Sequence, residues 1–253
     1  MNKHNIKVHE EKSKVRPIFH DSKAIFDRYK RATKLPKKNY VKRIHDIQKE
    51  YLKNPYYGFQ KRTFDIIISL GVTLLILSWL YPLLFVLIKL ESKGPAIFKQ
   101  KRNGLHMDPF NCYKFRSMRI NEFCDSIPVT DANDYRITNL GKFLRKYSLD
   151  ELPQFLNVLK GEMTVVGPRP HMVSETNTFI EISQDFHKRH DVKPGITGLA
   201  QINNCRGYIG SIGHLSSRIK YDLFYIRNAS LRFDIIIVYK TIIQMFFGRS
   251  KGH

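Results

Sequence analysis

Cysteine is scarce in this chain of 253 residues, and this scarcity excludes whole classes of protein. The three cysteines, Cys112, Cys124 and Cys205, are odd in number and have no metal-binding or redox spacing. A reducing compartment is therefore favoured over a disulfide framework. The sequence also lacks a P-loop, a dinucleotide fingerprint, an internal repeat and histidines at metal-ligand spacing.

Acidic residues are also few. The chain has 22 Asp and Glu against 43 Lys and Arg, a formal charge of +21, which indicates an anionic partner. Through Arg62 there are 18 basic and 6 acidic residues, so more than half of the excess lies there. We predict that residues 1–60 form a basic, partly disordered arm along anionic membrane lipids. A solvated tail without a partner is the alternative.

A long apolar run, Phe64–Leu90, follows the arm. A bilayer core needs about 20 mainly apolar residues in a helix. Pro82, after Tyr81, predicts a kink, and Lys and Arg flank the run on both sides, as expected when both ends stay cytoplasmic. We predict a re-entrant membrane helix over residues 61–91, kinked near Tyr81 and Pro82. A straight span is the alternative.

The sequence around this run carries two further signals. The first residues are polar and basic, so we expect no signal peptide and a cytoplasmic domain. Four aromatic residues before the run have the pattern of an interfacial belt: Tyr51, Tyr56, Tyr57 and Phe59.

The remainder, residues 92–250, predicts a cytoplasmic catalytic domain of short strands and amphipathic interfacial helices. The fold class is therefore α+β with a re-entrant membrane helix. Strands are expected at 96–102, 110–118 and 163–166, and helices at 140–148, 148–160, 173–188, 215–227 and 231–247. Gly161 suits the position after a helix end. The last helix is apolar over most of its surface, which places it at the membrane interface.

The pair Asp150-Glu151 is the sharpest local feature. Ser148 followed three residues later by Glu151 matches a capping box, so a purely structural role is one interpretation. The other is chemical, because a carboxylate at a helix start stays ionised and can act as a nucleophile or hold a divalent metal.

Polar and basic residues in Pro- or Gly-punctuated segments could converge on this pair and neutralise phosphate oxygens. The candidates for substrate or phosphate binding are Gln100, Arg102, Lys114, Arg116, Arg145, Arg169, Arg189 and Lys193. Arg169 lies between two prolines, and its stiff backbone suits a bidentate grip on phosphate. The alternative for each basic residue is a solvated or lipid-facing surface.

Several segments together resemble the bacterial sugar transferase family, the monotopic phosphoglycosyl transferases. They are KRTFDIIISL, GPAIFKQKRNG, YKFRSM, SLDELPQFLNVLKGEMTVVGPRP and KPGITGLAQIN, in the family's order over about residues 60–247. The chain looks like the small form, without the extra membrane helices of longer members. The family's re-entrant segment breaks at Ser-Pro in some members, whereas Tyr81 precedes Pro82 here.

The resemblance implies a reaction at the inner membrane of a bacterium, on its cytoplasmic face. A sugar phosphate passes from a nucleoside diphosphate sugar, expected to be a UDP-sugar, to polyprenyl (undecaprenyl) phosphate. The resemblance implies that Asp150 is the nucleophile and Glu151 its partner. It also implies that both residues take part in binding Mg²⁺ (or Mn²⁺). The sugar and the pathway stay open, as does a homodimer. A membrane-tethered nucleic-acid binder and a non-catalytic scaffold are the rival classes; no nucleic-acid-binding module is recognisable.

Overall fold

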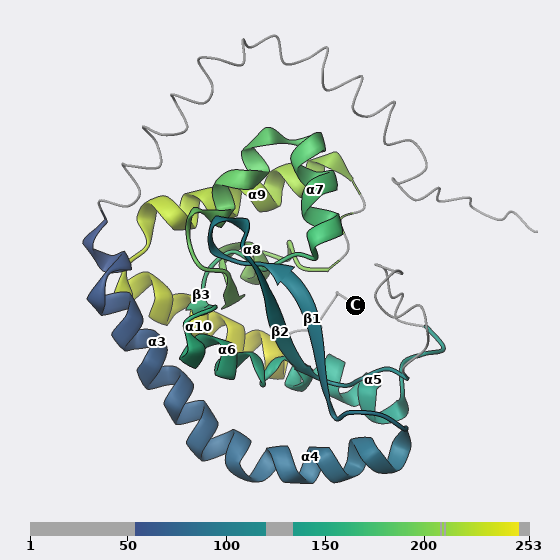
Figure 1. Ribbon diagram of the computed structural model, residues 1–253. Coiled ribbons are helices and arrows are strands. Elements are labelled where there is room, and N and C mark those ends of the chain that lie inside the picture. The colour runs from purple at the N-terminus through teal and green to yellow at the C-terminus, as the bar shows by residue number, and fades with distance from the viewer. Residues whose placement is uncertain (1–53, 120–133, 208, 210, 248–253) are drawn as a thin grey trace, which may run out of the picture.

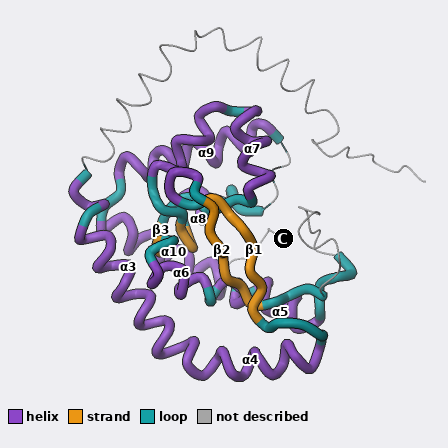
Figure 2. The backbone as a smooth tube through the Cα atoms, in the orientation of Figure 1, coloured by secondary structure: helices purple, strands orange, loops and turns teal. Residues whose placement is uncertain are grey.

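The structure is a computed structural model that describes residues 54–119, 134–207, 209 and 211–247. Helices surround two small two-stranded sheets (Figures 1 and 2), so the α+β class is confirmed. The predicted arm, residues 1–60, lies almost wholly outside the described residues.

One long helix curves along the left and lower edges of the domain in Figure 1. It consists of α3 (Phe59–Val72), a π-helical turn (Thr73–Leu77) and α4 (Ser78–Glu91). These 33 residues are long and apolar enough to cross a membrane. In Figure 1 the helix changes direction between α3 and α4.

The change of direction coincides with the π turn, one turn before Pro82, and the helix continues through Tyr81 and Pro82. The amide of Ser78 donates to the Thr73 carbonyl oxygen, five residues back. The Ser78 hydroxyl and the Trp79 indole donate to the carbonyl oxygens of Leu74 and Leu75, at 2.6 and 2.9 Å. Such inserted donors and π turns are known causes of helix bending, so the bend precedes the proline.

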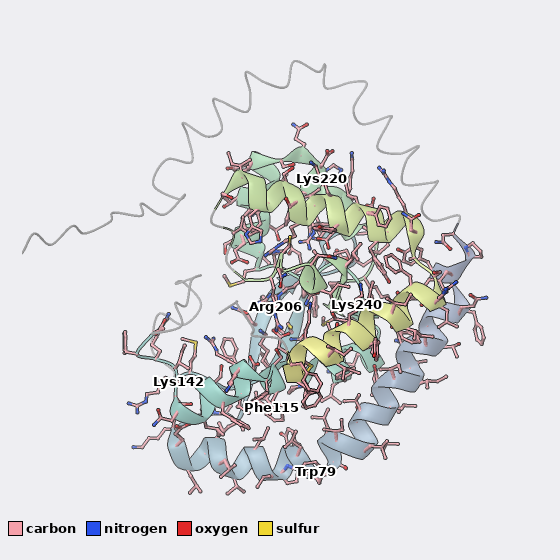
Figure 3. The ribbon with its side chains drawn as sticks, turned by 180° about the vertical axis from the view of Figure 1, so that it is seen from behind. Trp79, Phe115, Lys142, Arg206, Lys220 and Lys240 are labelled. Atoms are coloured by element: carbon pink, nitrogen blue, oxygen red, sulfur yellow. The ribbon has the colours of Figure 1, made fainter. Side chains whose placement is uncertain are left out.

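Both halves of this helix pack on the same domain. In α3 the buried residues Lys61, Asp65 and Ser69 recur every four positions, which places them on one face. In α4, Leu80, Leu84 and Ile88 pack in one apolar cluster with Phe115 and Leu144. The opposite faces expose apolar side chains, including Leu75, which is 75% exposed, and Trp79, which points away from the domain in Figure 3.

The residues before α3 are part of the core, contrary to the predicted aromatic belt. Tyr56 is buried, and its hydroxyl donates to the Asp234 carboxylate at 2.6 Å. Tyr57 donates to the Ile226 carbonyl oxygen at 3.0 Å. Phe59 is 84% exposed, and Tyr51 lies outside the described residues. Hydrogen bonds to elements near the C-terminus override the interfacial preference of Tyr56.

The three predicted strands are present, and a further strand, Gly195–Thr197, was not predicted. β1 (Ile97–Asn103) and β2 (Pro109–Phe115) form an antiparallel hairpin, and β3 (Thr164–Val166) pairs in parallel with β4 (Gly195–Thr197). Beside β3 the backbones approach so closely that a Cβ atom on Gly195 would lie 2.1 Å from the Gly167 nitrogen. Only glycine allows this contact.

The helices predicted at 140–148, 148–160, 215–227 and 231–247 have counterparts, but the one predicted at 173–188 ends at Ile182, and the short helix Leu199–Ile202 was not predicted. The remaining helices are α5 (Asn139–Lys146), α6 (Gln154–Lys160), α7 (Val173–Ile182), α8 (Leu199–Ile202), α9 (Ile212–Asn228) and α10 (Leu231–Phe247), with a 3₁₀ helix at Gln184–Asp191. Gly161 ends α6 with a left-handed φ of 84°, which confirms its predicted position. One side of α10 is exposed and apolar, including Ile235, Ile242 and Phe246.

Candidate active site

Asp150 and Glu151 lie in a single 3₁₀ turn, Leu149–Glu151, between α5 and α6. The predicted capping box is absent. Ser148 has a left-handed φ of 53°, which differs from the extended backbone of an N-cap, and its side chain makes no capping bond. Both carboxylates are 5% exposed. The structural alternative therefore loses its basis, because neither side chain caps a helix.

Glu151 is held by three cations. Arg169 donates to both of its oxygens, at 2.6 and 3.1 Å, in the two-pronged geometry that arginine favours. Lys114 lies 3.1 Å from Oε1, and Arg206 lies 3.5 Å from Oε2. Burial alone would raise the pKa of Glu151, but these cations hold that pKa well below its usual range. Glu151 is therefore ionised and fixed.

Asp150 is different from its neighbour. Its Oδ1 is buried and has no hydrogen-bond partner among the described residues. Burial raises the pKa of Asp150, and Lys114 and Arg145 act in the opposite direction. A buried acceptor without a partner is uncommon and calls for an explanation such as a catalytic role. The arrangement leaves one carboxylate oxygen free to bind or attack a ligand beside a fixed cluster of cations.

Of the other predicted site residues, Arg145 also faces the pair, since its charge acts on both Asp150 and Glu151. Its guanidinium donates to Ser117 Oγ at 3.1 Å and Met118 Sδ at 3.2 Å, which hold it in place. Lys114, Arg145 and Arg169 therefore converge on the pair.

Two predicted residues hold the loop that carries Arg169. Arg102 donates to the Pro170 carbonyl oxygen and to Gln100 Oε1, so Gln100 orients Arg102. Arg189 donates to the Arg169 carbonyl oxygen at 2.9 Å and pairs with Asp222 at 2.7 Å. These contacts fix the loop in the position from which the Arg169 guanidinium binds Glu151.

Two predicted residues lie elsewhere. Arg116 donates to the carbonyl oxygens of Ile88, Ser92 and Lys93, at 3.3, 2.6 and 2.9 Å, so it closes the C-terminal end of α4. Lys193 lines a separate hollow of about 180 Å³ with Arg62 and Asp65. The reason for both is local: the carbonyl oxygens of a helix end bind Arg116, and the loop before β4 carries Lys193 to the α3 side.

Sequence reasoning missed Arg206, which lies in the irregular segment after α8 (Figure 3) and pairs with Glu151. It also missed the buried residues His171 and Arg218. Arg206 is 55 positions from Glu151, and no spacing in the sequence indicates the contact.

A metal could be held here only in part by protein groups. Within the described ranges, no group of three or more His, Cys, Asp or Glu side chains is placed to share an ion. Mg²⁺ is commonly held by one or two carboxylates together with waters and substrate phosphates. The free oxygen of Asp150 fits that role, whereas Glu151 would first have to release one of its cations.

Comparison with known proteins gives this site its context. A model of the family described as "Bacterial sugar transferase" matches residues 56–248. The chain belongs to the bacterial sugar transferase family. This bacterial sugar transferase is 48% identical, over 190 residues, to the UDP-glucose:undecaprenyl-phosphate glucose-1-phosphate transferase of Klebsiella pneumoniae. The aligned part is 75% of this chain and 41% of that protein, so the chain spans about two fifths of this relative.

Two further relatives differ in length and in named substrate. The exopolysaccharide production protein PSS of Rhizobium leguminosarum bv. phaseoli is 43% identical over 199 residues, which cover 76% of this chain and 97% of that protein. The UDP-N-acetylgalactosamine-undecaprenyl-phosphate N-acetylgalactosaminephosphotransferase of Aeromonas hydrophila is 39% identical over 209 residues, 82% of this chain and 49% of that protein. The named sugars differ between relatives, so similarity alone does not identify the sugar.

Proposed function

We propose that this sugar transferase moves a sugar 1-phosphate from a UDP-sugar to undecaprenyl phosphate, the first membrane step of exopolysaccharide, capsule, O-antigen or glycoconjugate synthesis. The observation that carries this proposal is the free, buried Oδ1 of Asp150 beside the cations around Glu151. The relatives' names support it, because they specify UDP-sugars and undecaprenyl phosphate.

The geometry suits a reaction in two displacements. An Asp150 oxygen attacks the phosphorus next to the sugar, a P–O bond forms, and the bond from that phosphorus to the nucleoside monophosphate breaks. An oxygen of the lipid phosphate then attacks the same phosphorus, and the aspartyl P–O bond breaks. Lys114, Arg145, Arg169 and Arg206 would neutralise the phosphate oxygens in both steps. A divalent ion such as Mg²⁺, when bound at Asp150, would add positive charge at the same oxygens.

The first test supplies a panel of nucleoside diphosphate sugars with undecaprenyl phosphate and measures release of nucleoside monophosphate. We expect release of UMP from a UDP-sugar, and formation of the lipid product only when the lipid phosphate is present. A folded protein that releases no nucleotide from any member of the panel would contradict the proposal.

We also propose that the long helix enters and leaves the inner membrane on the cytoplasmic face. A straight helix of 33 residues would be about 50 Å long, longer than the bilayer core of about 30 Å. Its ends would then lie on opposite sides. Yet Arg62, at the start, donates to the carbonyl oxygens of Val158 and Leu159, and Ile88, at the end, packs on Phe115 of the same domain.

The exposed apolar faces of α4 and α10 support this orientation, because such faces lie flat in a membrane surface. Two of the basic residues that flank the apolar run have a structural role. Lys61 is buried and Arg62 is bound to α6, so these two residues act inside the protein. The basic arm before them would meet the anionic headgroups instead.

Single cysteines at positions 58 and 93, both exposed, test the topology. In a variant whose three native cysteines are replaced by serine, we expect both positions to react with a membrane-impermeant thiol reagent from the cytoplasmic side only. Cysteine at the exposed position 220 of α9 is the control for that side. Labelling of 58 and 93 from opposite sides would establish a straight span. Pro82→Leu should shift the helix toward a span, because it restores a backbone donor and removes the clash of the proline ring with the carbonyl oxygen of Ser78, directly after the π turn.

A further inference from the structure

A second group of buried charges lies behind the carboxylate pair. His171 follows the loop that carries Arg169, Arg189 comes from the 3₁₀ helix after α7, and Arg218 and Asp222 lie one turn apart on α9. All four are buried, at 2–5% exposure. The Asp222 carboxylate pairs with Arg189, at 2.7 and 3.0 Å. This pair leaves Arg218 without a carboxylate partner of its own among the described residues.

His171 is placed between two donors. Arg189 contacts its Nδ1, and Arg218 lies 2.9 Å from its Nε2. A neutral imidazole has only one acceptor nitrogen, and guanidinium groups only donate. Whichever nitrogen of His171 carries the proton, that N–H therefore faces another N–H. Protonation would not relieve this contact, and burial with both arginines holds the pKa of His171 well below its usual range.

Two guanidinium nitrogens in the same region also have no partner within the described residues. The Nε atoms of Arg206 and Arg218 are both buried and unpaired. Arg218 donates to the Gly207 carbonyl oxygen at 2.9 Å, one residue beyond Arg206. Arg206 in turn reaches Glu151. The unsatisfied donors of His171, Arg206 and Arg218 thus border the cation cluster of the active site on one side.

The charges in this region do not balance. The carboxylate of Asp222 pairs with Arg189, and the carboxylate of Glu151 pairs with Lys114, Arg169 and Arg206. Burial and the neighbouring Arg189 lower the pKa of Arg218 to about 10. Excess buried cations with free N–H groups require an acceptor that carries negative charge.

We propose that Arg206, Arg218 and His171 bind a phosphate group, and that it is the phosphate that leaves with the nucleoside. This inference rests on the proposed function and extends it from the attacked phosphorus to the leaving group. Guanidinium forks match the oxygens of phosphate in pairs. Because this site adjoins Arg206, a phosphate bound here would lie next to the phosphate that the cations around Glu151 bind. The two would be the adjacent phosphates of a nucleoside diphosphate.

A lipid phosphate has the same chemistry, but the arrangement favours the nucleotide. The site lies among α7, α9 and the loop after α8, and these helices lie on the opposite side of the domain from α4 in Figure 1. The rings of Phe179 and Phe186 pack edge-on against His171, at 5.4 Å. They hold the imidazole in place from the interior.

The test compares Arg218→Gln with Lys220→Gln. Lys220 is two residues further along α9 and exposed, so its replacement removes the same charge at the surface (Figure 3). Affinities for UMP, inorganic phosphate and farnesyl phosphate, a short lipid phosphate, are measured by calorimetry in detergent. For Arg218→Gln we expect UMP to bind at least about tenfold more weakly, with farnesyl phosphate unchanged. Lys220→Gln should bind all three as the wild type does.

Other outcomes would overturn the assignment. Unchanged UMP affinity in Arg218→Gln would remove the site, and a loss confined to farnesyl phosphate would assign it to the lipid. Without ligand, Arg218→Gln should unfold at the wild-type temperature or above it, because a repelled cation is gone. A lower unfolding temperature would show a merely structural arginine. Arg206→Gln, at a more exposed position, repeats the affinity measurement should Arg218→Gln not fold.

Kinetics separates this inference from the proposed function. Uniform loss of nucleotide binding should raise KM for the UDP-sugar and leave kcat within a few-fold. The covalent adduct on Asp150 should still form in Arg218→Gln at high UDP-sugar concentration. If the wild type forms no adduct, the proposed function fails, while the UMP affinities still decide the phosphate site.

Discussion

Asp150→Asn is expected to reduce nucleoside monophosphate release by at least about a thousandfold while the protein stays folded. Asparagine keeps the size and much of the hydrogen bonding of Asp150 but lacks the attacking carboxylate. The side chain caps no helix, and its Oδ1 has no partner among the described residues, so little stability depends on its charge. Turnover is measured with UDP-sugar and undecaprenyl phosphate, and folding by thermal unfolding in detergent.

Mass spectrometry provides the direct observation. Wild-type protein given UDP-sugar without lipid phosphate should carry a sugar phosphate on Asp150, and Asp150→Asn should carry none. Asp108→Asn, at an exposed position in the turn between β1 and β2, is the matched control and should keep full activity. An active Asp150→Asn variant, or an adduct on another residue, would exclude Asp150 as the nucleophile.

Lys61→Met is expected to have the largest effect on stability, about 3–5 kcal/mol in the free energy of unfolding. The Lys61 ammonium binds the Asp234 carboxylate, the Val166 carbonyl oxygen at 2.9 Å and the Tyr225 hydroxyl at 3.3 Å. Asp234 is fully buried. Without Lys61 its negative charge would be left in the interior with only tyrosine hydroxyls as donors.

The measurement is denaturant unfolding in detergent. Lys240→Met, at an exposed position on α10 (Figure 3), is the control and should change the unfolding free energy by no more than about 0.5 kcal/mol. Lys61→Met combined with Asp234→Asn should recover part of the loss, since the unpaired charge is gone. If Lys61→Met alone is as stable as the control, this ion pair does not hold α3 to α10.

Local pattern was sufficient to predict several elements. The patterns of residues 96–102 and 110–118 predicted β1 and β2, the helical pattern of residues 148–160 predicted α6, and Gly161 predicted where it ends. Each of these features depends on residues close in sequence. The same reasoning failed at Ser148, whose capping pattern is overridden because Glu151 binds cations from three other segments.

The sequence by itself determined the family, the apolar run with its proline and the adjacent carboxylates, because each is a contiguous motif. Only the tertiary structure decided the state of those carboxylates. Glu151 meets Lys114, Arg169 and Arg206 from separate elements, whereas Asp150 keeps a free oxygen. Tertiary packing likewise turned Arg116 to the end of α4 and buried Lys61 against Asp234, 173 positions away. Such contacts depend on how segments that are far apart in the sequence pack together. The spacing of residues along the chain does not show which of these segments will meet.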